Sequence, residues 1–373
     1  MKMPAQTGLV NGMLHQLLAD TPDLPAGVLN SVTESGSAMA ELLVASPDVD
    51  VLSYTGSTRV GRTIMAGAAE RLKRVSLELG GKTPMIVFAD ADLDVVMPTL
   101  TAAVTTFAGQ FCMTGSRILV QEDIAEDLSA RLVASLSRVR VGPGYDPESD
   151  MGAMIDAAAA RRDDRMVQAA IDAGHAVPLV RGGQRGDTAF YEPSLLAVTD
   201  LEAPIVQEEV FGPVATFETF IDEDDAIAGA NATDYGLAAS IWSRDLDTPA
   251  RVGARVRAGT VWTNAWAVVT DYFEEGGFKQ SGVGRLNGAP RLPSSRRPRH
   301  TCTPIADALP ASAQSHSETP RPAASRPYGG RACLPSPRMR RAAAAVTLAD
   351  APTRHPAPGR HHRPRRQDPR CAS

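Results

Sequence analysis

Cysteine is scarce in this chain of 373 residues, which has four cysteines in all. Three of them lie beyond residue 288, together with five of the seven histidines, and no two cysteines form a CxxC pair. This pattern argues against a disulfide framework and against a zinc site, so we expect no bound metal. Cys112 is the one cysteine in the first 288 residues, which raises the question of why a single thiol is kept there.

Long apolar runs are also missing. No stretch approaches the run of about 20 apolar residues that a membrane helix needs. The first residues, MKMPAQTGLV, lack the apolar centre of a secretory signal. Since 43% of the residues are nonetheless hydrophobic, a packed core is expected. We therefore expect a cytoplasmic protein that does not contact a membrane.

Charge divides the chain into two parts. Residues 1–288 hold 22 basic and 39 acidic side chains, a net charge of −17, whereas residues 289–373 hold 16 arginines and four acids, a net charge of +12. The second part also contains 15 of the 28 prolines. Proline and clustered positive charge oppose a packed core, so we predict a disordered, basic Pro/Arg-rich tail in which only residues 339–350 could form a helix.

A basic tail could bind nucleic acid or an acidic surface in a salt-dependent way. Tyr328 is, however, the single aromatic residue of the tail, so the tail lacks the series of rings on which bases stack. We therefore do not expect nucleic acid as a partner.

Helical and strand patterns alternate over residues 8–288, which predicts an α/β fold with a parallel sheet covered by helices. The predicted helices are residues 8–21, 37–46, 57–72, 92–108, 123–139 (capped by Asp123), 156–174, 222–233 and 248–259. The predicted strands are residues 25–32, 48–56, 74–79, 84–89, 116–121, 239–243 and 260–264, and residues 204–220 are predicted as a strand, a turn and a second strand.

The motif YTGSTRVGR, residues 54–62, places Gly56 and Ser57 between a strand and a helix. The start of a helix presents free N–H groups and the positive end of a dipole, which suit a phosphate. An ordinary strand-to-helix turn with a serine cap is the alternative interpretation of these residues.

Three further motifs contain candidate reactive groups. In LELGGK, Glu78 could be a general base if it is partly desolvated, or an ordinary strand-end glutamate. In GQFCMTGSR, small neighbours let the backbone approach Cys112 as a nucleophile needs, although a lone cysteine is more often structural. In QEEVFGPV, the acids Glu208 and Glu209 precede Phe211, and adjacent acids usually form a solvated face.

The order and spacing of these motifs are more specific than any one of them. Cys112 follows Glu78 by 34 positions and precedes Glu209 by 97. The series TGST, LELGGK, GQ-x-C-x-x-GSR, EE-x-FGP and GGFKQSG resembles the NAD(P)-dependent aldehyde dehydrogenase superfamily over about residues 2–288.

This resemblance implies a division of the chain into domains. Residues 1–80 would be what remains of a Rossmann-type dinucleotide-binding domain, and residues 81–265 an α/β catalytic domain that carries the thiol. Residues 266–288 would return along the fold, and the disordered tail would follow from residue 289.

The resemblance also implies a reaction, the oxidation of a small-molecule aldehyde to a carboxylic acid. Cys112 would attack the aldehyde to give a thiohemiacetal, and loss of hydride would leave a thioester. Glu78 would then activate the water that hydrolyses the thioester. The opening question has an answer in these terms, because a thiol is both a better nucleophile and a better leaving group than a hydroxyl.

The same resemblance implies which residues bind the cofactor, NAD or NADP. Glu209 would hold the nicotinamide ribose, with Phe211 packed nearby, and Lys2 would contact the adenine ribose. Gly56 and Ser57 would face the pyrophosphate. Ala5 stands where many NAD-preferring members have a glutamate, which removes repulsion toward the 2′-phosphate of NADP.

The chain also departs from the family pattern. The family's Pro-Trp-Asn motif lies upstream of the position that matches Lys2, so one oxyanion donor would be absent, at a cost of roughly 10²–10³ in rate. A homo-oligomer is expected, but the strand that would join the oligomer is not matched beyond residue 288. The alternatives are therefore an inactive fragment or an interaction protein with a binding tail, and a CoA-acylating variant, which Glu78 disfavours.

Overall fold

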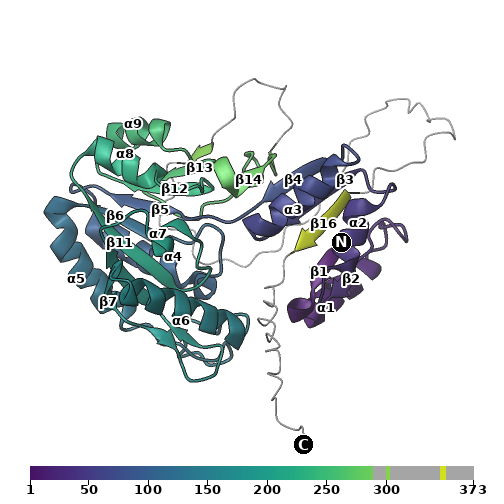
Figure 1. The fold of residues 1–373 in the computed structure, drawn as a ribbon, viewed down its shortest axis with the longest axis horizontal. Helices are drawn as coiled ribbons and strands as arrows, with labels where there is room; N and C mark the ends of the chain where they lie inside the picture. The colour runs from purple at the N-terminus through teal and green to yellow at the C-terminus, as the bar shows by residue number, and fades with distance from the viewer. Residues whose placement is uncertain (289–299, 303–344, 350–373) are drawn as a thin grey trace, which may run out of the picture.

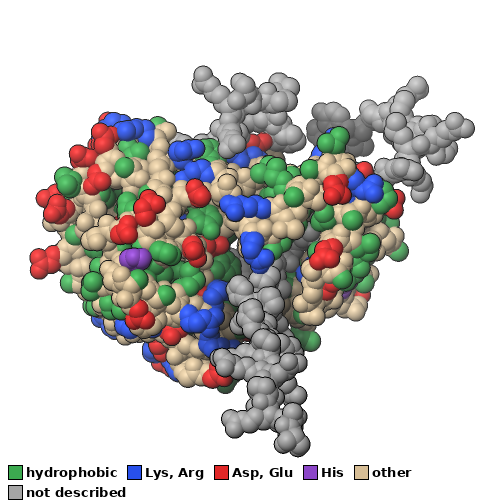
Figure 2. All heavy atoms as spheres, viewed as in Figure 1, with side chains coloured by type: hydrophobic (Ala, Val, Ile, Leu, Met, Phe, Trp, Pro, Cys, Tyr) green, Lys and Arg blue, Asp and Glu red, His purple; other side chains and the backbone are tan. Residues whose placement is uncertain are grey.

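The computed structural model describes residues 1–288, 300–302 and 345–349. Its strands form two large sheets that lie side by side, with β4 of the first sheet leading into β5 of the second (Figure 1). Acidic side chains are spread over both parts of the face shown in Figure 2, as the charge of residues 1–288 leads one to expect. In the part of the chain that is described, no helix has the length and apolar character needed to cross a bilayer.

The first sheet has the strand order β14-β4-β3-β16-β1-β2, and its neighbours run parallel except where β14 meets β4. The carboxyl ends of parallel strands lie at the same edge of a sheet. The turns that follow β1, β3 and β4 therefore share one edge, and ligands bind at this edge in such sheets. The strands are β1 (Lys2–Pro4), β2 (Val32–Glu34), β3 (Val51–Thr55), β4 (Arg74–Glu78), β14 (Gly282–Val283) and β16 (Ala345–Ala349), and the helices are η1 (Ala5–Thr7), α1 (Gly8–Ala19), α2 (Ala38–Ala45) and α3 (Thr58–Ala69).

The second sheet has the order β15-β13-β12-β5-β6-β11-β10-β7 and is parallel except where β7 meets β10. Its strands are β5 (Pro84–Val87), β6 (Arg117–Gln121), β7 (Ala176–Val180), β10 (Ser194–Val198), β11 (Val214–Phe220), β12 (Ala238–Trp242), β13 (Thr260–Thr263) and β15 (His300–Cys302). The short strands β8 (Gly183–Gln184) and β9 (Tyr191–Glu192) pair separately.

Helices cover both faces of this second sheet (Figure 1). The helices are α4 (Leu93–Thr105), α5 (Ala125–Leu136), α6 (Ala157–Asp172), α7 (Pro204–Gln207), α8 (Glu223–Asn231) and α9 (Asp247–Arg255), with 3₁₀ turns η2 (Thr106–Gly109), η3 (Glu122–Ile124) and η4 (Lys279–Ser281). In β5, Met85 and Val87 pack with Leu100 of α4 and Leu128 of α5, whereas Ile86 packs on the other face. A strand buried on both faces explains why β5 reads as a continuous apolar run.

The alternation of strands and helices predicted from the sequence is confirmed, with two exceptions in type. The strand predicted over residues 25–32 is wrong, because β2 begins only at Val32. The preceding residues turn, with Val28 N–H bonded to Pro25 and Gly27 at a φ of 83°. Proline and glycine in that stretch favour a turn over the strand that the apolar residues suggested.

The strand predicted at the start of residues 204–220 is also wrong, because Pro204–Gln207 form helix α7. Pro204 has the φ that the first turn of a helix requires, and Ala203 accepts the N–H groups of Val206 and Gln207. The predicted cap at Asp123 fails as well: Asp123 lies in η3, and the residue that precedes α5 is Ile124.

Most of the tail predicted to be disordered lies outside the described residues. Two short stretches are described as strands: β15 pairs with β13, and β16 lies between β1 and β3. The helix considered possible over residues 339–350 is therefore wrong over Ala345–Ala349.

Candidate active site

Glu78, the predicted general base, ends β4 and is paired on the backbone with Thr55 of β3 and Gly282 of β14. Its side chain is largely buried, and its Oε1 finds no hydrogen-bond partner among the described residues. Burial, followed by the charge of Glu275, raises the pKa of Glu78 to about 8, against a smaller lowering by Arg285. A carboxylate with a pKa near neutral pH is suited to accept a proton.

Cys112, the predicted nucleophile, lies in the loop between η2 and β6. Phe107, Ala108 and Gly109 all have positive φ values, of 53°, 54° and 67°, so helix α4 does not continue to residue 108 as predicted. A Cβ at Gly109 would overlap the backbone of Gly212, which shows how tightly this turn packs against the loop that carries Glu209.

Hydrogen bonds fix the loop around the thiol. The Thr114 hydroxyl donates to Gly109 O at 3.0 Å, and the Trp266 indole N–H donates to Met113 O at 2.9 Å. Gly81 packs against the carbonyl of Cys112 so closely that a side chain at residue 81 would collide with it. The two glycines of LELGGK therefore bring the end of β4 against the cysteine loop.

Three carboxylates act on the Cys112 thiol. Burial and then the charges of Glu209, Glu78 and Glu275 raise the thiol pKa to about 12, whereas the backbone N–H of Cys112 itself lowers it. The thiol is therefore protonated at neutral pH in this state. The pKa of this one thiol is thus set by carboxylates that are far apart in the sequence, at residues 78, 209 and 275, and by the backbone of Cys112 itself.

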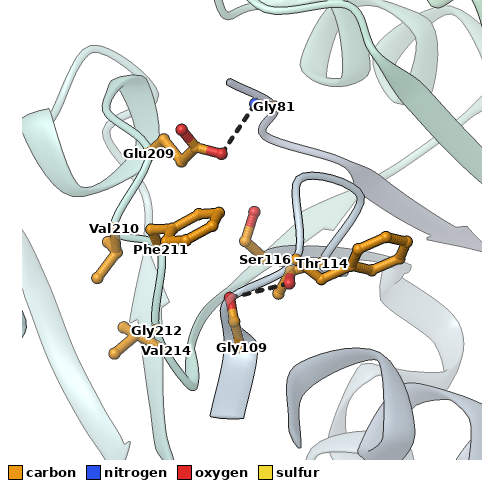
Figure 3. Close-up of a pocket in the computed structure, with 10 residues that line it drawn as sticks. Gly81, Gly109, Thr114, Ser116, Glu209, Val210, Phe211, Gly212 and Val214 are labelled. Carbon is orange, nitrogen blue, oxygen red and sulfur yellow. Dashed lines mark hydrogen bonds between the residues drawn. The ribbon is translucent and has the colours of Figure 1, made fainter. Parts of the chain in front are cut away.

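Glu209 lies in the loop between α7 and β11. The N–H of Gly81 donates to its Oε1 at 3.0 Å, and a Cβ at Gly80 would lie only 2.5 Å from its Oε2. Figure 3 shows the carboxylate directed at Gly81, with the Phe211 ring projecting from the same loop toward Ser116. Burial raises the pKa of Glu209 to about 7, opposed by the Gly81 N–H, Lys82 and Arg162.

Gly56 and Ser57 lie at the edge of the first sheet, between β3 and α3. The N–H of Gly56 donates to Glu78 O at 3.0 Å, which joins this turn to the end of β4. The Ser57 hydroxyl caps α3 by accepting from Val60 N–H at 3.5 Å, and the first turn of α3 contains no acidic residue. The start of α3 therefore presents the positive end of its dipole with no acidic side chain in its own first turn.

Lys2 is buried in β1, two strand positions from β3. It belongs to the same sheet as Gly56 and Glu78, and β1 opens on the same edge. The structure therefore gathers Glu78, Cys112 and Glu209 at one point. Gly56, Ser57 and Lys2 lie elsewhere along the first sheet, the same sheet in which Glu78 ends β4.

Sequence reasoning missed several residues of this region. Lys82 stands inside the motif LELGGK but was given no role, and Glu275, directly before the motif GGFKQSG, was not among the candidate residues. Arg162 and Asp163 had no signal at all, because a run of charges on a helix normally faces solvent. Among the described residues, no cluster of three or more His, Cys, Asp or Glu side chains is placed to hold a metal ion.

The comparison with known families decides the ancestry of this arrangement. Residues 1–294 match the sequence model described as the aldehyde dehydrogenase family. The chain belongs to the aldehyde dehydrogenase family.

Members of this family with known names are similar over most of the chain. It is 40% identical over 277 residues to a betaine aldehyde dehydrogenase of Bacillus subtilis, an alignment that covers 73% of this chain and 56% of the relative. It is 41% identical over 284 residues to a succinate-semialdehyde dehydrogenase of Paenarthrobacter nicotinovorans, which covers 74% of this chain and 62% of the relative. The chain thus spans a little more than half of the length of the relatives that it matches.

Solved structures of the family show the same fold. A betaine aldehyde dehydrogenase from Staphylococcus aureus, a point mutant in complex with NAD+ and with a BME-modified cysteine, matches with a TM-score of 0.73 and 34% identity. The match covers 77% of this chain and 60% of that one. A second structure of the enzyme from this organism, also in complex with NAD+, matches with a TM-score of 0.71 and 33% identity.

Proposed function

We propose that this aldehyde dehydrogenase chain oxidises a small aldehyde to the carboxylic acid with NAD+ or NADP+, through a thioester on Cys112. One observation carries the proposal. The partly buried thiol of Cys112 lies within electrostatic reach of Glu78, whose pKa of about 8 suits a general base, and of Glu209, the predicted ribose ligand. The family supports the proposal, since its named relatives are dehydrogenases of aldehydes.

The residues at the sheet edge fit a dinucleotide. The start of α3 at Ser57 presents the positive end of the helix dipole and has no acidic residue in its first turn, which suits a pyrophosphate. Glu209 provides a partly buried carboxylate for ribose hydroxyls, and Lys2 lies in β1, which opens on the same edge. A bound oxidised nicotinamide supplies a positive charge and a hydride acceptor. Because Ala5 carries no carboxylate, the chain tolerates the 2′-phosphate of NADP.

The first chemical task of the chain is to turn a protonated thiol into a nucleophile. Glu78 has a much lower pKa than Cys112 but a higher pKa than Glu209, so Glu78 or a water beside it takes the thiol proton. The sulfur then forms a bond to the carbonyl carbon. The backbone N–H of Cys112, which already faces its own sulfur, donates to the oxygen that becomes negative.

The second task is hydrolysis of the thioester. Glu78, once it has released the thiol proton to solvent, removes a proton from water as the water oxygen bonds to the acyl carbon, and the C–S bond breaks. The sulfur leaves and regains a proton, which restores the starting state of Cys112. The unpartnered Oε1 of Glu78 is the atom available to bind this water.

Two variants test the proposal by separating its two steps. We expect Cys112→Ser to form no NADH from an aliphatic aldehyde. Glu78→Gln should form about one equivalent of NADH per chain and then stop, at a reduced rate because water alone must take the thiol proton. Mass spectrometry of the Glu78→Gln protein should find the acyl group on the peptide that contains Cys112. Cys302→Ser is the matched control and should leave NADH formation unchanged. Acylation of any other residue, or turnover by Cys112→Ser, would refute the mechanism.

A further inference from the structure

The loop that carries Glu209 lacks regular secondary structure between α7 and β11, and yet its main chain is fixed on both sides of Glu209. On one side, Lys82 Nζ donates to the carbonyl of Glu208 at 2.8 Å. On the other side, Arg162 Nη2 donates to the carbonyl of Val210 at 2.9 Å. The carbonyl groups of the two residues on either side of Glu209 are thus each held by a cation.

The two cations reach the loop from different elements. Lys82 stands just before β5 and is 3% exposed, so it is a buried ammonium group. Arg162 comes from α6, on the far side of the loop. A loop held from two elements in this way can shift only if one of these bonds breaks, because neither cation is attached to the loop itself.

Arg162 is itself held in place. Its Nε and Nη2 donate to Oδ1 of Asp163 at 3.0 and 2.7 Å, and Asp163 is fully buried. The other oxygen of Asp163, Oδ2, has no hydrogen-bond partner among the described residues and lies against Gly212. Asp163 therefore fixes the guanidinium group and also supports the far end of the loop.

The loop needs such support because one of its residues has an unfavourable backbone conformation. Phe211 has a φ of 61°, a left-handed conformation that residues other than glycine rarely adopt. A carbonyl bond to a charged donor is stronger than one to a neutral donor, so the two cations are suited to hold this conformation. Both cations also favour the ionised form of Glu209, in opposition to its burial.

We propose that Lys82 and Arg162 are positioning residues that fix the carbonyl groups of Glu208 and Val210, on either side of Glu209, and so orient its carboxylate toward the ribose hydroxyls of the dinucleotide. This inference rests on the proposed role of Glu209 as the ribose ligand. Neither cation touches the cofactor. Their effect is on how well the protein binds NAD+, and not on the chemistry at Cys112.

The test measures NAD+ binding by calorimetry in the full chain. We expect Arg162→Met to raise the Kd of NAD+ by about tenfold, the loss that one charge-assisted hydrogen bond implies. The KM for NAD+ should rise in parallel, with kcat at saturating NAD+ changed by less than about threefold. Arg162→Lys keeps one donor and should recover most of the affinity. Lys82→Met should resemble Arg162→Met, with Lys82→Arg as its conservative partner.

Controls separate positioning from general stability. Arg165→Met removes an exposed arginine from the same helix and should leave the Kd unchanged. Lys73→Met removes a lysine that also donates to two carbonyls, those of Leu43 and Ser46, but at the opposite end of β4. It should lower stability without raising the Kd for NAD+. If the buried Lys82→Met fails to fold, the half-exposed Arg162 still decides the question.

Glu209→Gln distinguishes the two levels of the argument. If Glu209→Gln leaves the Kd of NAD+ unchanged, the proposed role of Glu209 is wrong, and the positioning role falls with it. If Glu209→Gln weakens binding but the folded Arg162→Met and Lys82→Met proteins bind NAD+ as tightly as the unaltered chain, the positioning role alone is overturned. If all three weaken binding and Arg165→Met does not, the inference holds.

Discussion

Replacing Glu78 by glutamine should abolish hydrolysis and, at alkaline pH, stabilise the folded protein. The structure gives the reason. Burial raises the pKa of Glu78 from 4.5 to about 8, so the folded chain keeps this proton over a range of pH in which the unfolded chain has lost it. Between pH 4.5 and 8, each pH unit therefore lowers the free energy of unfolding by up to about 1.4 kcal/mol.

The size of the effect follows from the width of this range. Above pH 8, the raised pKa of Glu78 lowers the free energy of unfolding by about 5 kcal/mol at most. Because the side chain retains some exposure, we expect a lowering of between about 2 and 5 kcal/mol. At pH 4, both forms of the protein carry a neutral group at this position and should be about equally stable. At pH 9, Glu78→Gln avoids a buried charge and should be the more stable protein by the stated amount.

Urea denaturation at pH 4, 6, 7.5 and 9 measures this difference directly. The control is Glu202→Gln, which removes an exposed carboxylate and should shift the urea midpoint by the same small amount at every pH. The reasoning would be refuted if Glu78→Gln tracked the unaltered chain in parallel from pH 4 to pH 9. That outcome would mean that Glu78 ionises as readily in the folded chain as in the unfolded one.

Three other predictions follow from the same site. Glu275→Gln removes a charge that raises the pKa of Glu78, so the pH at half-maximal kcat should move to lower values, and a shift to higher pH would contradict the assignment. Without cofactor, alkylation of Cys112 by iodoacetamide should still accelerate between pH 8 and 10, because the thiol pKa is about 12; a plateau below pH 9 would show a free thiolate. Gly109→Ala should lower stability by at least about 2 kcal/mol in thermal melting, because the added methyl group meets Gly212 at a positive φ, and an unchanged Tm would rule out this packing.

Local sequence patterns predicted the elements that depend on local physics. Ser57 caps α3 as its position after Gly56 suggested, and the apolar run in β5 is buried on both faces. Where local signals conflict, prediction failed. The stretch that begins at Pro204 has the apolar residues of a strand, but the favourable position of proline in a first turn makes it a helix. The division into domains at residues 80 and 265 stays a prediction.

The candidate site divides in the same way. Glu78, Cys112 and Glu209 were predicted because their order and spacing in the sequence are specific. Lys82 and Arg162 could not be predicted, because each acts on a backbone carbonyl, 126 and 48 positions away. Any residue can provide such a carbonyl, so the partner leaves no trace in the sequence, and only the folded chain shows the contact.

The three carboxylates near Cys112 also affect how readily its thiol is oxidised. Peroxides attack sulfur in its anionic form, and burial together with neighbouring negative charge keeps this sulfur protonated at neutral pH. The carboxylates to which the proposed mechanism gives catalytic roles would thus also slow the oxidation of Cys112 in the absence of substrate.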